Sequence, residues 1–374
     1  MISFDKRKAL TSLSPFISKI VSSKSPLPIC EFVLIEINKG EDVMRMTCTE
    51  GNLTGTARIT LSQFAEEDFK VCVQARLLQD MLKSLPDGEV TLFVKEKGAF
   101  LRWSSGESML YTAEPTDFPN TYPINEPTVD GSLKVSSLAL SLKCVAGATA
   151  DESFGRPALS SILFDSLNGT MNLVASDSHQ LICASFPSVL PVGNFLLPEQ
   201  GAGLLNAVLA VTESDTVKVT CNNSHARFEM DDFSVTSTLV AAKFPKYSGV
   251  IPQNPPGILL IERTRLIQII KRASVFCDKA TGAIGLTFSP GNLKITSEDL
   301  GYGMNLNESI CCEYTGPEVS MKVKAALLVD VLNSILGERV EIGVTESLRP
   351  LRFRPDASEN KEETQVAVLM PAGK

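Results

Sequence analysis

The sequence has little of the chemistry from which catalytic and metal sites are usually built. Its 374 residues include only two histidines, His179 and His225, so a histidine-rich metal site is not expected. No segment matches the phosphate-binding patterns GxGxxG and GxxxxGK followed by Ser or Thr, or the nucleophile elbow GxSxG. Asp177 and His179 would share one face of a strand, and a nearby Ser or Cys could complete a triad with them. Because no elbow accompanies them, we expect no catalysis, no metal and no cofactor.

Long hydrophobic runs and paired cysteine motifs are missing too. No apolar run approaches the ~20 residues that a helix needs to span a bilayer. Segment 1–13 has neither the apolar core nor the small-residue cleavage site of a signal peptide. The nine cysteines are odd in number and show no CxxC spacing, which suits reduced thiols. We therefore expect a cytoplasmic protein.

Aromatic residues and positive charge are also scarce overall. A single tryptophan, Trp103, and five tyrosines argue against a single-strand binder that stacks bases on aromatic rings. The net charge of −8 excludes a general basic attraction to nucleic acid. The hydrophobic fraction of 44% is ample for buried cores, and the length suggests two to four domains.

The most informative feature is internal repetition with a period near 125 residues. Predicted helices carry paired leucines at 77/78, 204/205 and 327/328, which are spaced by 127 and 123 residues. Predicted strands end in an acidic turn at Glu50, Asp177 and Glu298. Two Phe-Pro pairs, at 118–119 and 244–245, lie 126 apart, and each leads into a proline-rich stretch that reads as a linker. A period this long indicates whole domains, which we place at 1–126, 127–253 and 254–374.

Each repeat is expected to run helix, strands, helix, strands. The first helices are predicted near 5–24, 136–150 and 262–280, and the second ones over 75–82, 202–209 and 325–332. Strands without helical crossovers indicate antiparallel sheets with helices on one face. The sequence therefore predicts an α+β fold made of three tandem repeats.

Charge is distributed unevenly between these elements. Six segments that contain the predicted helices together carry +9, which leaves −17 for the rest of the chain. Basic residues on helix faces suit contacts with phosphates that do not depend on base sequence. The alternative is that these lysines and arginines only solvate exposed helix faces.

Several segments resemble the motifs of a known family. Segments 159–165 (LSSILFD) and 172–181 (NLVASDSHQL) are similar to its motifs L-x-x-(I/M)-L-F-(E/D) and (V/A)-(T/S)-D-(G/S)-H-R-L. Segment 243–252 (KFPKYSGVIP) is similar to R-F-P-(D/N)-Y-x-x-V-(I/L)-P, and 330–333 (DVLN) and 368–371 (VLMP) match further motifs. Through these motifs the chain resembles, over nearly its whole length, the bacterial DNA polymerase III β subunit, the replication sliding clamp.

The resemblance implies a ring of six similar domains, formed by a head-to-tail homodimer, that encircles duplex DNA and confers processivity on the replicative polymerase. Sheets would face outward and helices inward. Twelve helices of ~10 Å diameter side by side would leave a bore of roughly 28 Å. An ATP-driven clamp loader would be needed, because the chain has no nucleotide motif. The expected DNA-binding residues are Lys19, Lys24, Arg76, Lys83, Lys143, Lys271 and Arg272.

The resemblance also implies two protein-binding surfaces. DNA polymerases and repair proteins would dock a short peptide rich in Gln, Leu and Phe between the second and third domains. The matching positions are Arg156, Leu159, Ser176, His179, Leu181, Pro245, Val250, Leu327, Leu348, Val368, Met370 and Pro371. The dimer interface would join Met109 and Leu110 to Val275 and Phe276. Either set could instead be ordinary core.

The chain departs from the family pattern at a few positions. Gln180 stands where an Arg usually follows the histidine, Gly249 replaces another Arg, and the chain ends in Ala-Gly-Lys rather than an apolar residue. These changes put the usual peptide consensus in doubt. Two other functions remain open: a clamp-like protein scaffold that does not encircle DNA, and a hydrolase built around Asp177 and His179.

Overall fold

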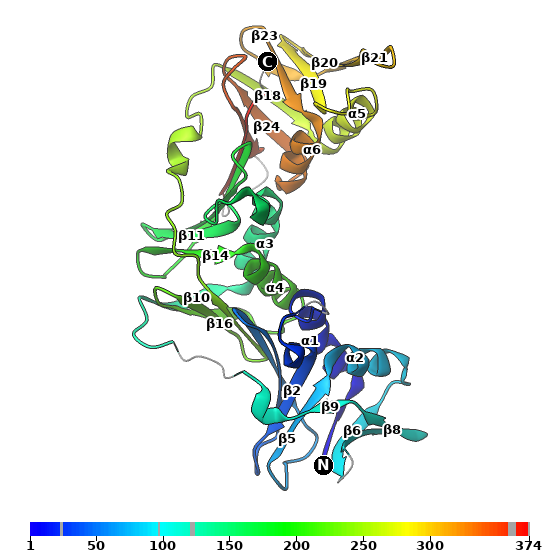
Figure 1. Cartoon of the computed structure of the whole chain (residues 1–374). Coiled ribbons are helices and arrows are strands. Elements are labelled where there is room, and N and C mark those ends of the chain that lie inside the picture. Colours follow the sequence, from blue (N-terminus) through cyan, green and yellow to red (C-terminus); the bar gives the residue numbers. More distant parts are fainter. Residues whose placement is uncertain (23–24, 96–97, 120–123, 358–363, 373–374) are drawn as a thin grey trace. The chain divides into compact units, whose positions relative to one another are not determined.

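The fold is α+β, as predicted. The computed structural model describes residues 1–22, 25–95, 98–119, 124–357 and 364–372, so the predicted DNA contact Lys24 lies outside the described residues. Within these ranges six α-helices and 26 strands form, and the strands pair in antiparallel fashion in four sheets (Figure 1).

The same order of elements occurs three times: a strand, a helix, four strands, a helix and three strands, with short extra strands in the first and third sets. The first set consists of β1 (Ile2–Asp5), α1 (Lys6–Lys19), β2 (Phe32–Ile37), β3 (Val43–Glu50), β4 (Leu53–Thr60), β5 (Phe69–Gln74), α2 (Ala75–Ser84), β6 (Glu89–Lys95), β7 (Gly98–Trp103), β8 (Gly106–Leu110) and β9 (Thr112–Ala113). The second set consists of β10 (Val129–Lys134), α3 (Val135–Val145), β11 (Ser161–Leu167), β12 (Thr170–Ser176), β13 (Gln180–Pro187), β14 (Gly193–Pro198), α4 (Glu199–Leu209), β15 (Thr216–Cys221), β16 (His225–Glu229) and β17 (Phe233–Thr238). The third set consists of β18 (Gly257–Glu262), α5 (Arg263–Val275), β19 (Ala283–Ser289), β20 (Asn292–Asp299), β21 (Met304–Cys311), β22 (Glu313–Thr315), β23 (Val319–Lys324), α6 (Ala325–Ser334), β24 (Arg339–Val344), β25 (Leu351–Pro355) and β26 (Thr364–Leu369).

The helices follow from apolar residues at helical spacing. In α2, Leu78 and Leu82 are buried on one face, and in α6 the same role falls to Leu328 and Leu332. The carboxylate of Asp5 caps α1 by accepting a hydrogen bond from the Lys8 backbone N–H at 2.9 Å. This helix ends at Lys19, one turn earlier than the sequence predicted.

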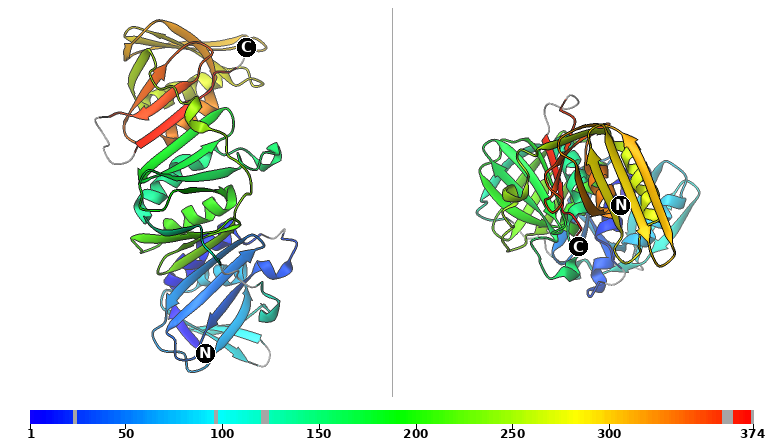
Figure 2. Two further views of the ribbon diagram at one scale, coloured as in Figure 1. Left: turned by 90° about the vertical axis from the view of Figure 1, so that its left-hand side faces the viewer. Right: turned by 90° about the horizontal axis from the view of Figure 1, so that it is seen from above.

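Two compact units make up the chain. The first comprises residues 1–139 and 200–239, and the second comprises 140–199 and 240–374. Each unit holds one four-stranded and one nine-stranded sheet, and one pair of helices packs together in each: α1 with α2 in the first unit, α5 with α6 in the second (Figure 1). The left view of Figure 2 shows the strands of the first unit spread as a broad sheet.

Each nine-stranded sheet is assembled from two successive sets of elements. In the first unit the strand order is β10-β15-β16-β17-β4-β3-β2-β5-β9, so β17 of the second set pairs with β4 of the first. In the second unit the order is β14-β11-β12-β13-β26-β25-β24-β18-β22, so β26 pairs with β13. We call these two pairings the closed seams. Within the described residues the four-stranded sheets β1-β6-β7-β8 and β21-β20-β19-β23 have no such continuation, and they end at β1 and β8 and at β21 and β23. We call β8 and β21 the open edges, because they stand in the places that β17 and β26, and β4 and β13, occupy in their own sets.

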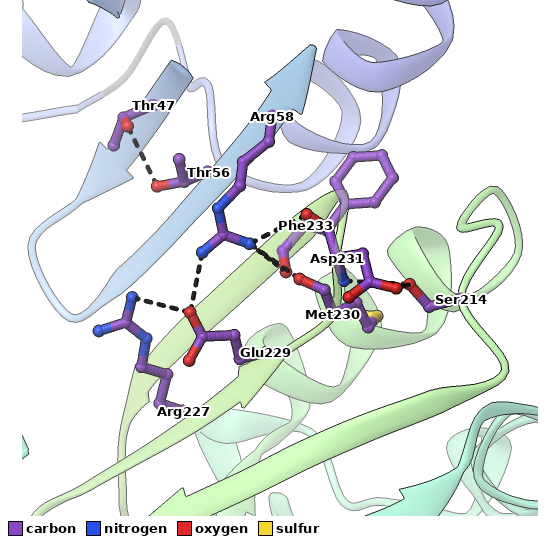
Figure 3. A network of polar contacts seen from close by, with 9 residues as sticks. All are labelled: Thr47, Thr56, Arg58, Ser214, Arg227, Glu229, Met230, Asp231 and Phe233. Carbon is purple, nitrogen blue, oxygen red and sulfur yellow. Dashed lines mark hydrogen bonds and ion pairs between the residues drawn. The ribbon is translucent and has the colours of Figure 1, made fainter. Parts of the chain in front are cut away.

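A polar network stabilises the closed seam of the first unit (Figure 3). From β4, the Arg58 guanidinium donates to the Glu229 carboxylate and to the Met230 carbonyl oxygen, both at 2.8 Å. The Arg58 backbone N–H donates to the Asp232 carbonyl oxygen at 2.7 Å. Arg58 therefore ties β4 to the turn between β16 and β17.

Candidate functional sites

The predicted DNA-binding residues that the structure describes all lie at exposed positions on helices. Lys19 is at the end of α1, Lys143 is in the last turn of α3, and the others are on α2 and α5. Arg76 and Lys83 are seven residues apart on α2, so they share one face. Exposure on helices is what a contact with phosphates requires.

Three of these cations are already engaged within the fold. The Arg76 guanidinium donates to the Val21 carbonyl oxygen at 2.7 Å. Lys83 lies 3.6 Å from the Asp80 carboxylate. Arg272 forms an ion pair with Glu308 of β21 at 2.5 Å, and the hydrogen bond to that carboxylate raises the pKa of Arg272. These side chains have less freedom to contact a phosphate than their exposure suggests.

The remaining predicted cations, Lys19, Lys143 and Lys271, have no ion-pair partner within the described part of the chain. The Lys19 ammonium lies close to α4, since a Cβ added at Gly203 would be 3.7 Å from its Nζ. Three further exposed cations lie on these helices outside the predicted set: Arg7 and Lys8 on α1, and Arg265 on α5.

The charge of α1 is partly neutralised. Its residues carry +4, but Lys6 and Arg7 both bind Asp87, with Lys6 Nζ 3.2 Å from the carboxylate. Hydrogen bonds from Arg7 and then Lys6 lower the pKa of Asp87 to about 2. The other strongly basic helix is α5, also at +4, whereas α4 and α6 each carry −1. The basic character therefore belongs to α1 and α5 rather than to all helices.

An apolar cavity of about 190 Å³ lies in the second unit. Nine of the twelve predicted peptide-binding residues line it: Arg156, Leu159, Ser176, His179, Leu181, Pro245, Val250, Val368 and Met370. Leu159, Leu181 and Val368 are buried at its floor, while Val250 and Met370 are about half exposed at its mouth. Such a cavity can take apolar side chains, each worth about 1.5–3 kcal/mol when fully buried.

One wall of the cavity is the turn between β12 and β13. The Asp177 carboxylate accepts hydrogen bonds from the backbone N–H groups of His179 at 2.7 Å and Gln180 at 2.8 Å. The Ser176 hydroxyl donates to the Gln180 carbonyl oxygen at 2.7 Å. The Met370 backbone N–H donates to the His179 carbonyl oxygen, which fixes the C-terminal segment beside the turn. Asp177 and His179 thus serve a turn, and the nearby Ser176 hydroxyl points to a carbonyl rather than to an imidazole.

The opposite wall is the segment 240–251, which we call the strap. Its Phe244 and Tyr247 pack on the core cluster that contains Leu163, Leu181 and Val368. The Tyr247 hydroxyl donates to the Asp165 carboxylate of β11 at 2.8 Å. Burial, and then this hydrogen bond, raise the pKa of Tyr247, so the phenol keeps its proton at neutral pH. The bond holds the strap at a fixed place on the sheet.

Three predicted peptide-binding residues do not line this cavity: Leu327 on α6, Leu348 in the β24–β25 loop, and Pro371. Leu348 is 66% exposed, and Leu327 and Pro371 are partly buried. Five lining residues were not among the predicted ones: Ser178, Gln180, Phe244, Lys246 and Tyr247. All five lie in the same two chain segments, 176–181 and 244–250, as predicted residues do.

The four predicted interface residues lie on β8 and at the end of α5. Met109 and Val275 are exposed, at 55% and 69%, and Phe276 is partly buried. The Leu110 side chain is 1% exposed, because it packs into the core of its own sheet. Only its backbone can therefore face a partner.

The described residues contain no cluster of three or more potential metal ligands, and none of their helices is long and apolar enough to cross a membrane. The pairing of Asp177 and His179 is explained by the turn. Three similar sets of elements, two strongly basic helices and an apolar cavity suit a DNA clamp better than a hydrolase.

Comparison with known proteins supports this class. Residues 3–123 match the family model of the DNA polymerase III beta subunit N-terminal domain, and residues 248–371 match that of its C-terminal domain. The beta sliding clamp of Salmonella typhimurium is 26% identical over 358 residues, covering 95% of both chains, and that of Synechocystis is 25% identical over 381 residues, covering 94% of both. A DNA polymerase III subunit beta from Pseudomonas aeruginosa, bound to griselimycin, matches with a TM-score of 0.92 and 25% identity over 100% of this chain and 99% of that one. A beta subunit from Thermotoga maritima has the same fold, with a TM-score of 0.91 and 20% identity over 100% of this chain and 99% of that one.

These observations define a DNA sliding clamp, a class of protein that acts by topology rather than by catalysis. The chain belongs to the family of DNA polymerase III beta subunits. Members of this family encircle DNA and make the polymerase processive, and they are not enzymes.

Proposed function

We propose that two copies of this chain close head to tail into a ring around duplex DNA, with β8 of one copy paired to β21 of the other. The three sets of elements act as clamp domains over 1–126, 127–253 and 254–374. A separate ATP-driven loader opens and closes the ring, and polymerases and repair proteins dock by peptide. The protein works in the cytoplasm, where reduced thiols are expected. The observation that carries this proposal is the equivalence between the closed seams and the open edges.

The two closed seams have the same register. In the first, one row of directly opposed residues runs Val219, Phe228, Val235, Gly55 and Cys48. In the second, the row runs Ile342, Phe353, Ala367, Ile182 and Ala175. Val219 and Ile342 each stand fourteen residues after the second leucine of their pair, and Gly55 and Ile182 are 127 apart. Because the same register occurs at both closed seams, we expect it a third time, between β8 of one copy and β21 of another.

The open edges supply the strands for that third pairing. Lys218 belongs to the row Lys218, Glu229, Ser234, Thr56 and Thr47 of the first seam. Its equivalent Thr91 begins the row Thr91, Arg102 and Glu107, which ends at β8. The row equivalent to Thr56 and Thr47 is Asn307 and Thr296, which ends at β21. The proposal therefore places Glu107 of one copy opposite Asn307 of the other, and Ser108 opposite Leu306.

Exposed apolar residues gather at the two open edges. Met109 and Tyr111 are 55% and 64% exposed at and beside β8. Met304 and Tyr302 are 38% and 74% exposed at and beside β21, and Val275, at the end of α5, is 69% exposed. An uncovered edge strand with apolar neighbours favours aggregation, so pairing with a second copy gives these residues a defined partner.

The DNA contacts proposed are those of the exposed helix cations. Lys19, Lys143 and Lys271 bind phosphates directly, and Arg76, Lys83 and Arg272 contribute less because they have partners in the fold. Such contacts are independent of base sequence and allow the ring to slide. Lys24 is proposed as a further contact from its place in the sequence.

The experiment that tests this function measures retention on nicked circular DNA after loading by the cognate loader, before and after the circle is linearised. A ring held by topology stays on the circle and leaves quickly once the DNA has ends. Equal retention on both forms, or no loading, would contradict the proposal and favour a clamp-like scaffold that does not encircle DNA. A matched variant with Lys19, Lys143 and Lys271 changed to Ala should still depend on topology, because closure does not need those contacts.

A further inference from the structure

The apolar cavity of the second unit has a positive rim in an acidic protein. Its lining contains two permanent cations, Arg156 and Lys246, and no carboxylate. The chain as a whole carries −8. The cavity lining is therefore positively charged although the protein as a whole is negatively charged. An exposed cation next to an apolar cavity favours a ligand that combines apolar anchors with negative charge.

Two acidic residues next to the cavity lining, Asp165 and Asp177, are already used within the fold. Asp165 accepts the hydrogen bond of the Tyr247 hydroxyl at 2.8 Å. Asp177 accepts the backbone N–H groups of His179 and Gln180. Neither carboxylate lies within ion-pair distance of Arg156 or Lys246, and over the residues that the structure describes neither cation has an ion-pair partner. Both cations are exposed and available to a ligand.

Two other arginines of the second unit do have ion-pair partners. Arg352 lies 2.8 Å from Glu341, and Arg339 lies 2.9 Å from Glu313. Arg156 has no comparable neighbour. Lys246 stands just before the short helix η5 (Tyr247–Val250) on the strap, and the Tyr247 bond to Asp165 fixes this part of the strap. The position of Lys246 at the rim is therefore maintained by the fold before any ligand binds.

We propose that Lys246, assisted by Arg156, makes this cavity select peptides in which apolar anchors are flanked by Asp or Glu. This inference rests on the proposed peptide-docking function and adds its charge preference. In the motif that carries the family resemblance, the position of Lys246 holds Asp or Asn, so this cation is particular to this chain, whereas Gln180 and Gly249 stand where the family pattern has arginines. Lys243, which is exposed three residues earlier, adds a further positive charge to the same segment.

The expected size of the preference follows from exposed ion pairs. One such pair strengthens binding by about 1.4- to 5-fold at low salt. With two rim cations, we expect an acidic peptide to bind about 2- to 25-fold more tightly than a neutral one. Because the Debye length falls from about 10 Å at 0.1 M to about 3 Å at 1 M salt, the preference should largely disappear at 1 M.

The test uses three fluorescent peptides with the same Gln-, Leu- and Phe-rich centre, flanked on both sides by Asp, Ser or Lys. Dissociation constants are measured by fluorescence anisotropy with the full chain and with Lys246→Glu. The control is Lys294→Glu, an exposed lysine on β20 that does not line the cavity and whose change alters the net charge equally. Far-UV circular dichroism checks that both variants fold.

The expected result is the affinity order Asp, Ser, Lys for the unchanged protein and for Lys294→Glu, and loss or reversal of that order for Lys246→Glu. Binding of all three peptides with equal affinity would overturn this inference and leave the docking function standing. The same shift in both variants would also overturn it, since net charge alone would then explain the preference. If none of the peptides binds at up to millimolar concentration, both the inference and the docking function are wrong.

Discussion

The closed seams and the open edges consist of equivalent strands in different surroundings. At the seam of the first unit, Val235 and Ala57 are fully buried, and Arg58 adds an ion pair and backbone hydrogen bonds. At the open edges, Met109 and Met304 are 55% and 38% exposed. Side chains on equivalent strands are therefore buried only where a strand from a second set of elements pairs with them. The open edges need a partner outside the chain to reach the same state.

The largest effect should come from placing a charge at the end of α5, which the proposed interface would bury. We expect Val275→Asp to weaken association of two copies by at least ~100-fold, because a buried unpaired carboxylate costs several kcal/mol. Sedimentation equilibrium across a concentration series measures the dimer constant. Val189→Asp is the matched control, since Val189 is 87% exposed and lies away from both open edges in sequence. An unchanged dimer dissociation constant for Val275→Asp would show that Val275 is not part of the interface.

A smaller effect is expected inside the closed seam. Arg58→Ala removes the bonds to Glu229 and to the Met230 carbonyl, and should lower the free energy of unfolding by about 1–2 kcal/mol. Urea unfolding followed by circular dichroism gives this value. Arg227→Ala is the control, because Arg227 lies 3.7 Å from the same Glu229 without crossing the seam (Figure 3). Equal losses in the two variants would show that crossing the seam adds no stability.

The smallest effect concerns thiol reactivity. Cys183 lies in β13 at the closed seam, and burial raises its pKa to about 11, so it should resist iodoacetamide at pH 8. Cys311 ends β21 and is exposed. We expect Cys311 to be alkylated about 5-fold more slowly in the dimer than in the Val275→Asp variant, because the β7–β8 turn of the partner would shield it. Peptide mass spectrometry gives both rates, and equal rates would contradict the shielding.

Much of this architecture could be predicted from the sequence because it depends on local patterns. The paired leucines set one buried helix face in each repeat, and helices occur at all three places. Nine of the predicted peptide-binding residues line one cavity, although they come from separate segments of the chain. The sequence alone could not show that the Leu110 side chain faces the core of its own domain, since both faces of an edge strand can carry apolar residues.

The cations were harder to predict, for a different reason. Sequence places Arg272 on an exposed helix position, but its partner Glu308 is 36 residues away on β21. Likewise, the Arg76 guanidinium binds the carbonyl oxygen of Val21. Whether an exposed cation is available for DNA depends on such distant contacts. The motif gives no reason to expect a cation at Lys246, because it usually holds Asp or Asn at that position.

The most direct test of ring closure is a disulfide placed by the seam register. Ser108 and Leu306 should form a non-hydrogen-bonded pair, with Cα atoms ~4.5 Å apart, which a disulfide can bridge. In a background with Cys311→Ser and Cys312→Ser, oxidation of Ser108→Cys/Leu306→Cys should give a covalent dimer on a non-reducing gel. The control pair is Ser108→Cys/Met304→Cys, in which the second cysteine lies two residues away from position 306 on the same face of β21. This pair should give little covalent dimer. Efficient crosslinking of the first pair alone would support the pairing of β8 with β21, whereas equal crosslinking of both pairs, or of neither, would contradict it.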